Sequence, residues 1–230
     1  MANLKGPPWS VINEATQLIR KFGSKIGEYP VVLEIGCNDG MHTRIFLNEI
    51  PGITMHCFEP DRRPLNRFDA AIGDDPRVVF YPVAVAEKTG KYPWFQSGGT
   101  TKTSWLEDWD LSSSIRRPTG HLQMSAWVTF TKVGDINAVS LDDWNSQNHS
   151  FRPIDLIFMD VQGAEADVIL GGKKTLANTR YLYSEYYDTP MYEGQKSLKQ
   201  LMELLGPDWE LEEVFKSDFF ARNKAAIGGG

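Results

Sequence analysis

Residues 31–40 constrain the fold of this chain more than any other segment. They read Val-Val-Leu-Glu-Ile-Gly-Cys-Asn-Asp-Gly, an apolar run that ends in a turn with two glycines. Residues 41–50 follow with helical character. This order is typical of a buried parallel strand, followed by a tight turn without side-chain bulk and then by a helix whose N-terminus faces a ligand. The segment therefore predicts an α/β fold with a nucleotide-like cofactor at its first turn.

The rest of the chain continues this alternation of strands and helices. Expected strands cover residues 31–35, 53–58, 78–85, 154–161 and 181–186, an antiparallel pair covers 92–95 and 127–132, and a terminal hairpin covers 210–215 and 219–223. Expected helices cover residues 10–22, 41–48, 64–72, 141–145, 163–177 and 197–205. The pattern predicts a Rossmann-like, doubly wound and mostly parallel sheet of seven strands with a C-terminal antiparallel hairpin. Ligands of such sheets bind at the carboxyl ends of the strands.

The length of 230 residues suits a single α/β domain over residues 1–230. An N-terminal helix at about 10–22 precedes the first strand. A polar segment at about 97–125 is inserted before the fourth expected strand, and connections of that length tend to be functional. We expect this insertion to form part of an acceptor wall or a lid.

Charge and cysteine content restrict the partners. The net charge of −6 argues against a nucleic-acid backbone or an anionic membrane as the main partner. Cys37 and Cys57 follow no metal or redox spacing, and reduced thiols suit a cytoplasmic protein. The N-terminus has no apolar signal core, and no segment has the apolar length of a membrane span. The oligomeric state is left open.

The residues of the first turn favour one cofactor over another. A dinucleotide fingerprint needs Gly-x-Gly-x-x-Gly, whereas here Gly36 and Gly40 are separated by Cys37, Asn38 and Asp39. The anionic oxygens of a pyrophosphate would be repelled by the carboxylate of Asp39. A cofactor with a cationic ammonium and a cationic sulfonium group suits the same place. Glu34 adds acceptor oxygens for a cationic or hydroxyl group. We therefore expect Glu34, Gly36, Asn38, Asp39 and Gly40 to bind the cofactor.

Glu59 strengthens this assignment from the second strand. It closes that strand, where an acidic side chain can accept hydrogen bonds from both hydroxyls of a ribose. An acid at this position serves NAD equally well, but together with the acidic first turn it favours S-adenosylmethionine. Residues 83–85, with Ala84 at their centre, should flank the adenine.

Four short segments carry a family resemblance. Between residues 32 and 165 they occur in this order: Val-Leu-Glu-Ile-Gly-Cys-Asn-Asp-Gly, Phe-Glu-Pro, Leu-Asp-Asp-Trp and Ile-Phe-Met-Asp-Val-Gln-Gly-Ala-Glu. The chain thereby resembles the FkbM-type methyltransferases, which have the class I S-adenosylmethionine-dependent fold. The resemblance implies methyl transfer to a hydroxyl oxygen, often of a sugar or a polyketide-like metabolite. Gln162 departs from the family's usual Glu and puts any role carried over to that position in doubt.

The chemistry of methyl transfer to a hydroxyl points to carboxylates as candidate bases. Asp160, at the end of the fourth expected strand, is the first candidate and is also expected to contact the cofactor, and Glu185 is the second candidate base. His121, within the polar insertion, is an alternative base or acceptor-site donor. Asp160, Glu165 and Glu185 could instead hold a divalent cation, which is possible but not expected. Glu165 could equally cap the helix that follows it.

Other side chains of the insertion and of the fifth strand suit an acceptor. Arg116 and Arg117 could recognise a phosphate or a carboxylate. His42, with Thr43, is expected only to cap the first helix after the turn. The candidate stacking surfaces for a sugar ring are Trp105, Tyr186 and Tyr187.

These observations lead to an S-adenosylmethionine-dependent O-methyltransferase that acts on a sugar, a glycan or another small polyhydroxylated metabolite. An NAD-linked oxidoreductase on a similar sheet and a nonenzymatic binding module remain alternatives. A nucleic-acid amino-methyltransferase is less favoured, because no Asn/Asp-Pro-Pro segment followed by Tyr, Phe or Trp is present to hold a flipped base.

Overall fold

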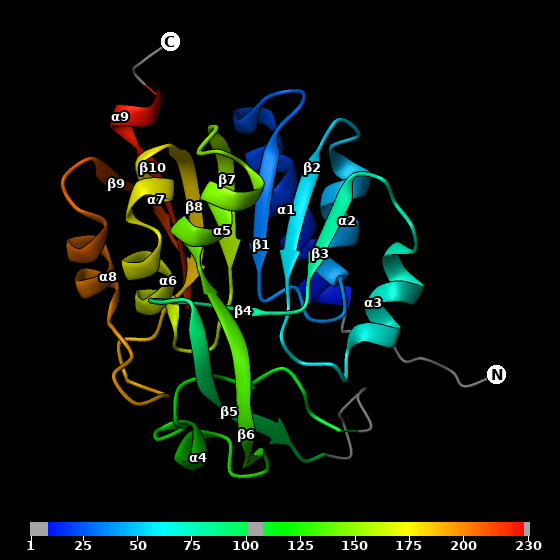
Figure 1. The fold of residues 1–230 in the computed structure, drawn as a ribbon, viewed down its shortest axis with the longest axis vertical. Helices are drawn as coiled ribbons and strands as arrows, with labels where there is room; N and C mark the ends of the chain where they lie inside the picture. The colour runs from blue at the N-terminus through cyan, green and yellow to red at the C-terminus, as the bar shows by residue number, and fades with distance from the viewer. Residues whose placement is uncertain (1–8, 101–107, 228–230) are drawn as a thin grey trace.

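A seven-stranded sheet forms the centre of the molecule (Figure 1). The computed structural model describes residues 9–100 and 108–227. The strand order is β3-β2-β1-β7-β8-β10-β9, in which neighbours from β3 to β8 are parallel and β10 runs antiparallel to both of its neighbours. The strands are β1 (Val31–Ile35), β2 (Thr54–Phe58), β3 (Val78–Tyr81), β7 (Ile154–Met159), β8 (Thr179–Glu185), β9 (Trp209–Val214) and β10 (Asp218–Asn223). The mostly parallel sheet and the terminal antiparallel hairpin are confirmed.

Helices cover both faces of this sheet (Figure 1). One face carries α1 (Trp9–Ile26), α2 (Met41–Glu49) and α3 (Leu65–Ile72). The other carries α5 (Leu141–Asn148), α6 (Glu165–Gly171), α7 (Lys173–Ala177) and α8 (Leu198–Leu205). The short helices α4 (His121–Met124) and α9 (Lys224–Ile227) complete the described helices.

Successive side chains of a strand point to opposite faces of the sheet, so the same strands contribute to a hydrophobic core under each layer of helices. Val32 and Phe158 belong to the cluster under α1 and α2, whereas Leu33 and Ile157 belong to the cluster under α5, α6 and α8. A strand that is buried on both faces needs apolar residues at successive positions. This explains why β1 and β7 are continuous apolar runs in the sequence.

A smaller sheet lies beneath the carboxyl ends of the parallel strands (Figure 1). Its order is β4-β6-β5, formed by β4 (Ala84–Ala86), β5 (Gly90–Gly98) and β6 (Thr129–Ser140). β5 and β6 are antiparallel, as expected, but extend well beyond residues 92–95 and 127–132. This sheet places the polar insertion over the edge at which ligands of α/β sheets bind.

Two segments that were each predicted as one continuous element are divided in the structure. Residues 78–85 form two strands in different sheets, because Pro82 lacks the N–H that a continuing ladder needs. Residues 163–177 form two helices, α6 and α7, with Gly172 between them. A Cβ at Gly172 would come within 2.8 Å of Leu141, so the break lies where the chain packs closely against α5.

Within the described residues, none of the helices combines the length and the apolar character that a membrane span requires.

Candidate active site

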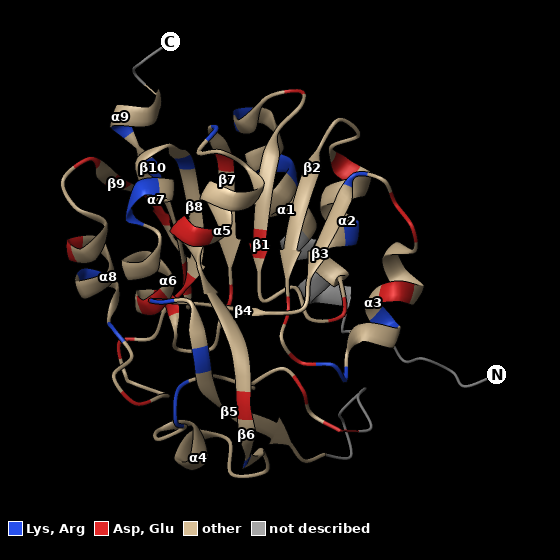
Figure 2. Cartoon of the chain, viewed as in Figure 1, with Lys and Arg blue, Asp and Glu red and all other residues tan. Residues whose placement is uncertain are grey.

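A cavity of about 230 Å³ lies at the carboxyl ends of β1, β2 and β7, beside the smaller sheet. Acidic positions gather along this edge, whereas the helices carry both signs of charge (Figure 2). The cavity is lined by Ile35, Gly36, Asn38, Met41, His42, Phe58, Glu59, Pro60, Val83, Ala84, Val85, Trp94, Asp110, Leu111, Ser113, Ser114, Ile115, Asp160, Val161, Gln162 and Ala164. We call it the first cavity.

Gly36 lets the first turn lie against the end of β7. Its φ is +89°, and a Cβ there would lie 1.9 Å from the carbonyl oxygen of Asp160. The amides of Gly36 and Cys37 both donate to the carbonyl of Phe58, at 2.9 and 3.1 Å. The turn therefore joins three neighbouring strand ends, which only a residue without a side chain permits.

Glu34 lies beneath this turn. Its side chain is 1% exposed and accepts a hydrogen bond from the hydroxyl of Thr43 in α2. Burial raises the pKa of Glu34 to about 8. Among the described residues, Glu34, Asp39 and Gly40 are absent from the wall of the first cavity. In the structure Glu34 supports the turn rather than facing the cavity, so its expected contact with the cofactor stays a prediction.

Asp39 and Gly40 shape the start of α2. Asp39 accepts a hydrogen bond from the amide of Met41 at 3.2 Å and lies 3.7 Å from Arg67. Gly40 has a left-handed conformation, with a φ of +75°, and a Cβ there would meet the ring of Phe68. Their direct contact with a cofactor likewise stays a prediction.

Glu59 is the buried acid of the first cavity. One of its carboxylate oxygens accepts the amide of Asn38 at 3.1 Å, and the other accepts the amide of Asp61 at 2.7 Å. Burial raises the pKa of Glu59 to about 8, against the opposing effect of these two donors. The two amides hold the carboxylate in one orientation at the place where the sequence predicts a ribose.

The polar insertion forms one wall of the first cavity. Asp110 is bound by Arg67 at 2.6 Å, and Asn38 donates to its carbonyl at 3.3 Å. Ser113 donates to Asp61 and accepts from Arg63. The described part of the insertion, residues 97–100 and 108–125, is thereby anchored to the turns after β1 and β2. Trp105 lies outside the described residues.

Asp160 stands at the end of β7 and faces the first cavity. The amide nitrogen of Gln162 donates to Asp160 at 2.6 Å and to Glu185 at 3.2 Å. Tyr187 donates to Glu185 at 2.8 Å. Burial and then the charge of Asp160 raise the pKa of Glu185 well above its ordinary value. Gln162 thus bridges the two leading catalytic candidates, although Glu185 is not among the described residues that line the cavity.

Gln162 adopts a left-handed backbone conformation with a φ of +53°. The oxygen of its side-chain amide lies 3.1 Å from the hydroxyl of Tyr192, which also lies 2.8 Å from the backbone carbonyl of Ser112. The next residue, Gly163, has a φ of +90°, and a Cβ there would lie 2.7 Å from Tyr192. The turn after β7 is therefore packed tightly against Tyr192, which is itself hydrogen-bonded to the insertion at Ser112.

His121 is not among the described residues that line the first cavity. Its ring is 7% exposed, packs against Tyr192 and Phe130, and lies 3.1 Å from the hydroxyl of Ser112. Burial lowers the pKa of His121. The structure places it among Phe130, Tyr192 and Ser112, so its expected role as a base or donor stays a prediction.

Glu165 lies at the first position of α6. It is 1% exposed and accepts a hydrogen bond from the amide of Gly163 at 3.1 Å. Burial raises the pKa of Glu165 to about 7. The carboxylate thus binds a backbone amide just before α6, but the N-cap residue, Ala164, has no side-chain cap hydrogen bond, so the capping role of Glu165 stays a prediction. In the part of the chain that the structure describes, no group of three or more His, Cys, Asp or Glu residues could hold a metal ion.

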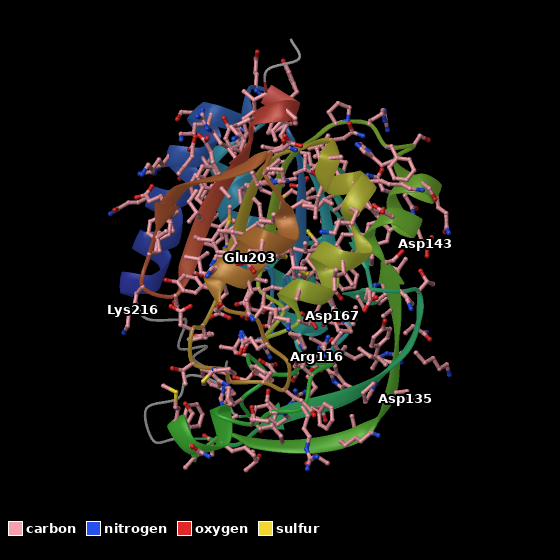
Figure 3. The ribbon with its side chains drawn as sticks, turned by 90° about the vertical axis from the view of Figure 1, so that its left-hand side faces the viewer. Arg116, Asp135, Asp143, Asp167, Glu203 and Lys216 are labelled. Atoms are coloured by element: carbon pink, nitrogen blue, oxygen red, sulfur yellow. The ribbon has the colours of Figure 1, made fainter. Side chains whose placement is uncertain are left out.

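Arg116 is paired within the protein, so its expected role in anion recognition stays a prediction. Its guanidinium forms a bidentate pair with the buried Asp167 of α6, at 2.7 and 2.5 Å (Figure 3). Two of the expected stacking residues are also bound internally. Tyr186 donates to the carbonyl of Phe215, and Tyr187 donates to Glu185.

His42 is the site residue that the sequence did not reveal. Half-buried in the first turn of α2, it lines the first cavity and also a second cavity of about 600 Å³ on the side of α1. Its ring lies 5.1 Å from that of Phe158, and burial lowers its pKa. Asp160 is the other side chain common to both cavities. The pattern Gly-Met-His suggested only helix capping, because sequence alone does not show two cavities meeting there.

Comparisons with known proteins agree with this geometry. A model of the methyltransferase FkbM domain matches residues 34–216. The 2-O-methyltransferase NoeI of Sinorhizobium fredii (strain NBRC 101917 / NGR234) is 42% identical over 198 residues, which cover 84% of this chain and 79% of that protein.

Solved structures share the fold at low identity. The O-methyltransferase from Bacillus cereus in complex with SAH is 12% identical, with a TM-score of 0.50, over 94% of this chain and 81% of that one. The O-methyltransferase TomG from Streptomyces achromogenes, in complex with SAM, is 11% identical, with a TM-score of 0.50, over 95% of this chain and 81% of that one.

The sheet order and the first cavity, taken with these matches, define a methyltransferase of the class I fold. The chain belongs to the FkbM methyltransferase family. This membership decides against the NAD-linked oxidoreductase alternative.

Proposed function

We propose that this methyltransferase transfers the methyl group of S-adenosylmethionine to a hydroxyl oxygen of a sugar, a glycan or another small polyhydroxylated metabolite. The observation that carries the proposal is a cavity with the oriented carboxylate of Glu59 in its wall and Asp160 at its junction with a second cavity. The name of the 42% identical relative, a 2-O-methyltransferase, supports oxygen as the acceptor atom and favours a hydroxyl at position 2.

The residues of the first cavity suit S-adenosylmethionine. Glu59 would accept hydrogen bonds from ribose hydroxyls, and Gly36 lets the backbone approach the ligand. Residues 83–85 supply apolar surface for the adenine, beside the insertion residues Ser113 and Ser114. When bound, S-adenosylmethionine supplies an electrophilic methyl group.

The protein's own contribution is to orient the acceptor and to accept its proton. Much of the acceleration comes from positioning the hydroxyl at the methyl group. Asp160 is our first candidate for the base, because it faces both cavities and is held by Gln162. His42 is a second candidate, since its lowered pKa keeps the ring neutral and able to accept a proton at neutral pH. Glu185 is less suited, because its raised pKa favours the protonated form.

Ligand binding tests the cofactor. S-adenosylhomocysteine should raise the melting temperature of the purified protein, whereas NAD at the same concentration should not. Glu59→Gln should weaken S-adenosylhomocysteine binding about 10-fold or more, because an amide has one acceptor oxygen and cannot accept the backbone amides of both Asn38 and Asp61, so the side chain loses its orientation. The exposed Asp135→Asn is the matched control. Stabilisation by NAD alone would overturn the proposal, and binding without turnover on a broad panel of hydroxyl acceptors would favour the nonenzymatic binding module.

Asp160→Asn tests the base. The substitution should leave S-adenosylhomocysteine affinity nearly unchanged and reduce turnover roughly 100-fold or more, the usual scale of general acid–base catalysis. Mass spectrometry of the methylated product gives the rate. Unchanged turnover would remove Asp160 from this role and direct the same test to His42.

A further inference from the structure

The second cavity lies next to the first, on the α1 side of the sheet. The elements that contribute to it are α1, α2, β7 with the residue after it, β8, and the end of β9 and start of β10 with the turn between them. Its lining residues are Gln17, Leu18, Lys21, His42, Phe158, Asp160, Tyr183, Glu213, Phe215, Lys216, Ser217 and Asp218. The strands β9 and β10 lie at the far edge of the sheet from β3, so the tertiary fold brings this turn to the site.

We propose that the second cavity binds the methyl acceptor, and that the acceptor is an uncharged, polyhydroxylated ring such as a neutral sugar residue. This inference rests on the proposed function and assigns it a second binding site. Two side chains, His42 and Asp160, line both cavities. A methyl group that leaves a donor in the first cavity therefore meets an acceptor in the second cavity beside these two groups.

The wall of the second cavity has the chemistry that a sugar ring needs. The rings of Phe158 and Tyr183 are stacked, with centroids 4.6 Å apart and planes at 8°, and Phe215 lies 6.2 Å from Tyr183. Aromatic surface packs against the C–H face of a ring, while carboxylates accept hydrogen bonds from its hydroxyls. Asp160 and Asp218 supply such carboxylates in the same wall.

The charges of the second cavity argue for an uncharged acceptor. Lys21 is paired with Glu213, so these two charges offset one another. The exposed Asp160 and the half-buried Asp218 add two further carboxylates to the wall, and burial followed by the charge of Asp160 raises the pKa of Asp218 to about 6. Lys216 is exposed on the β9–β10 turn, where Figure 3 shows it at the margin of the molecule. An anionic acceptor would meet these two carboxylates, one of which, Asp160, lines both cavities, and this costs electrostatic free energy.

The volume of the second cavity is consistent with a small, polyhydroxylated acceptor. About 600 Å³ falls in the range of 300–1,000 Å³ that small-molecule sites occupy. The cavity therefore has room for a sugar residue together with part of the molecule to which it is attached.

Binding to the S-adenosylhomocysteine-loaded protein tests the inference without depending on turnover. Saturation-transfer difference NMR should detect methyl glycosides of neutral hexoses and should give weaker signals for the matching uronic acids. Asp218→Asn should weaken binding of the neutral glycosides about 10-fold, because one charge-assisted hydrogen bond is lost. It should change S-adenosylhomocysteine affinity, measured by calorimetry, by less than twofold.

Asp135→Asn, in the exposed part of β6, is the control and should change neither affinity. Phe215→Leu keeps an apolar side chain and should weaken glycoside binding by removing aromatic surface, which gives a second variant if Asp218→Asn does not fold. Preferential binding of uronic acids, no binding of any glycoside, or unchanged glycoside affinity in both variants would overturn the assignment. Failure of S-adenosylhomocysteine itself to bind would instead contradict the proposed function.

Discussion

At the scale of single residues, the amide of Gln162 meets three other side chains. Its nitrogen donates to Asp160 and Glu185, and its carbonyl oxygen lies within hydrogen-bond distance of Tyr192. A Glu at this position, as the family usually has, would place a third carboxylate in the cluster. The uncharged amide instead separates two acids and orients Asp160. The sequence showed the departure from the family pattern, but only the structure shows its neighbours.

Gln162→Glu should therefore destabilise the protein at high pH. We expect a loss of about 1–3 kcal/mol in the free energy of unfolding at pH 8, because both donor bonds are replaced by like-charge repulsion. The loss should be smaller at pH 5, where the cluster takes up a proton. Urea denaturation at the two pH values measures it. Gln162→Met removes the donors without adding charge and should show less pH dependence; equal losses for both variants would contradict this account.

Glu34 gives the stability of the ligand-free protein a pH dependence. Its pKa is about 8 when folded and near 4.5 when unfolded, so the folded state binds more protons between these values. Its contribution to stability is fully present below about pH 4.5 and is lost as pH rises through about 8. Glu34→Gln should flatten the decline in unfolding free energy over this window, by up to about 1.4 kcal/mol per pH unit. Parallel curves for the two proteins would show that Glu34 does not titrate in this window.

At the scale of elements, the first turn shows how backbone geometry makes a site. β1 was predicted at its observed bounds, because an apolar run of five residues followed by Gly36 leaves few alternatives. The third expected strand failed, because local β-propensity extends across Pro82 while the hydrogen-bonding partners change from β2 to β6. Partners that are distant in sequence decide where such a strand ends.

Gly36→Ala should be among the most damaging small substitutions in this chain. The added Cβ would meet the carbonyl oxygen of Asp160 at 1.9 Å, in addition to the strain of a φ of +89°. We expect a loss of about 2–4 kcal/mol in unfolding free energy and loss of S-adenosylhomocysteine binding. Gly206→Ala is a matched control, because its φ is +93° and nothing lies within 4 Å of the added Cβ. Equal losses at the two positions would mean that strain alone, and not the approach of β7, requires Gly36.

At the scale of the whole molecule, the insertion and the main sheet are held together by a few polar contacts. Arg116 of the insertion binds Asp167 of α6, and Arg67 of α3 binds Asp110 of the insertion. The smaller sheet adds apolar contacts of Trp94 and Ile115 with Ala164. These contacts fix the wall of the first cavity relative to the strand ends that carry Glu59 and Asp160.

The Arg116–Asp167 pair should respond unequally to substitution of its two members. The side chain of Asp167 is 4% exposed, whereas that of Arg116 is 36% exposed. Arg116→Gln leaves a buried carboxylate unpaired and should cost about 3 kcal/mol, but Asp167→Asn leaves a cation that water can reach and should cost less. Glu203→Gln, in an exposed pair with Lys199, is the control and should cost almost nothing. The order of the three unfolding free energies checks this, and a larger loss for Asp167→Asn would contradict it.

The sequence by itself determined the doubly wound sheet, the turn at residues 36–40, the acidic end of β2 at Glu59 and the candidate base Asp160. These features depend on local patterns, because periodicity, glycine positions and strand-end acids lie within a few residues of one another. Only the tertiary structure decided that Glu34 and His121 lie away from the first cavity, that Arg116 pairs with Asp167, and that His42 joins Asp160 between two cavities. These positions depend on contacts between segments far apart in the chain, whose packing leaves no short-range signal in the sequence.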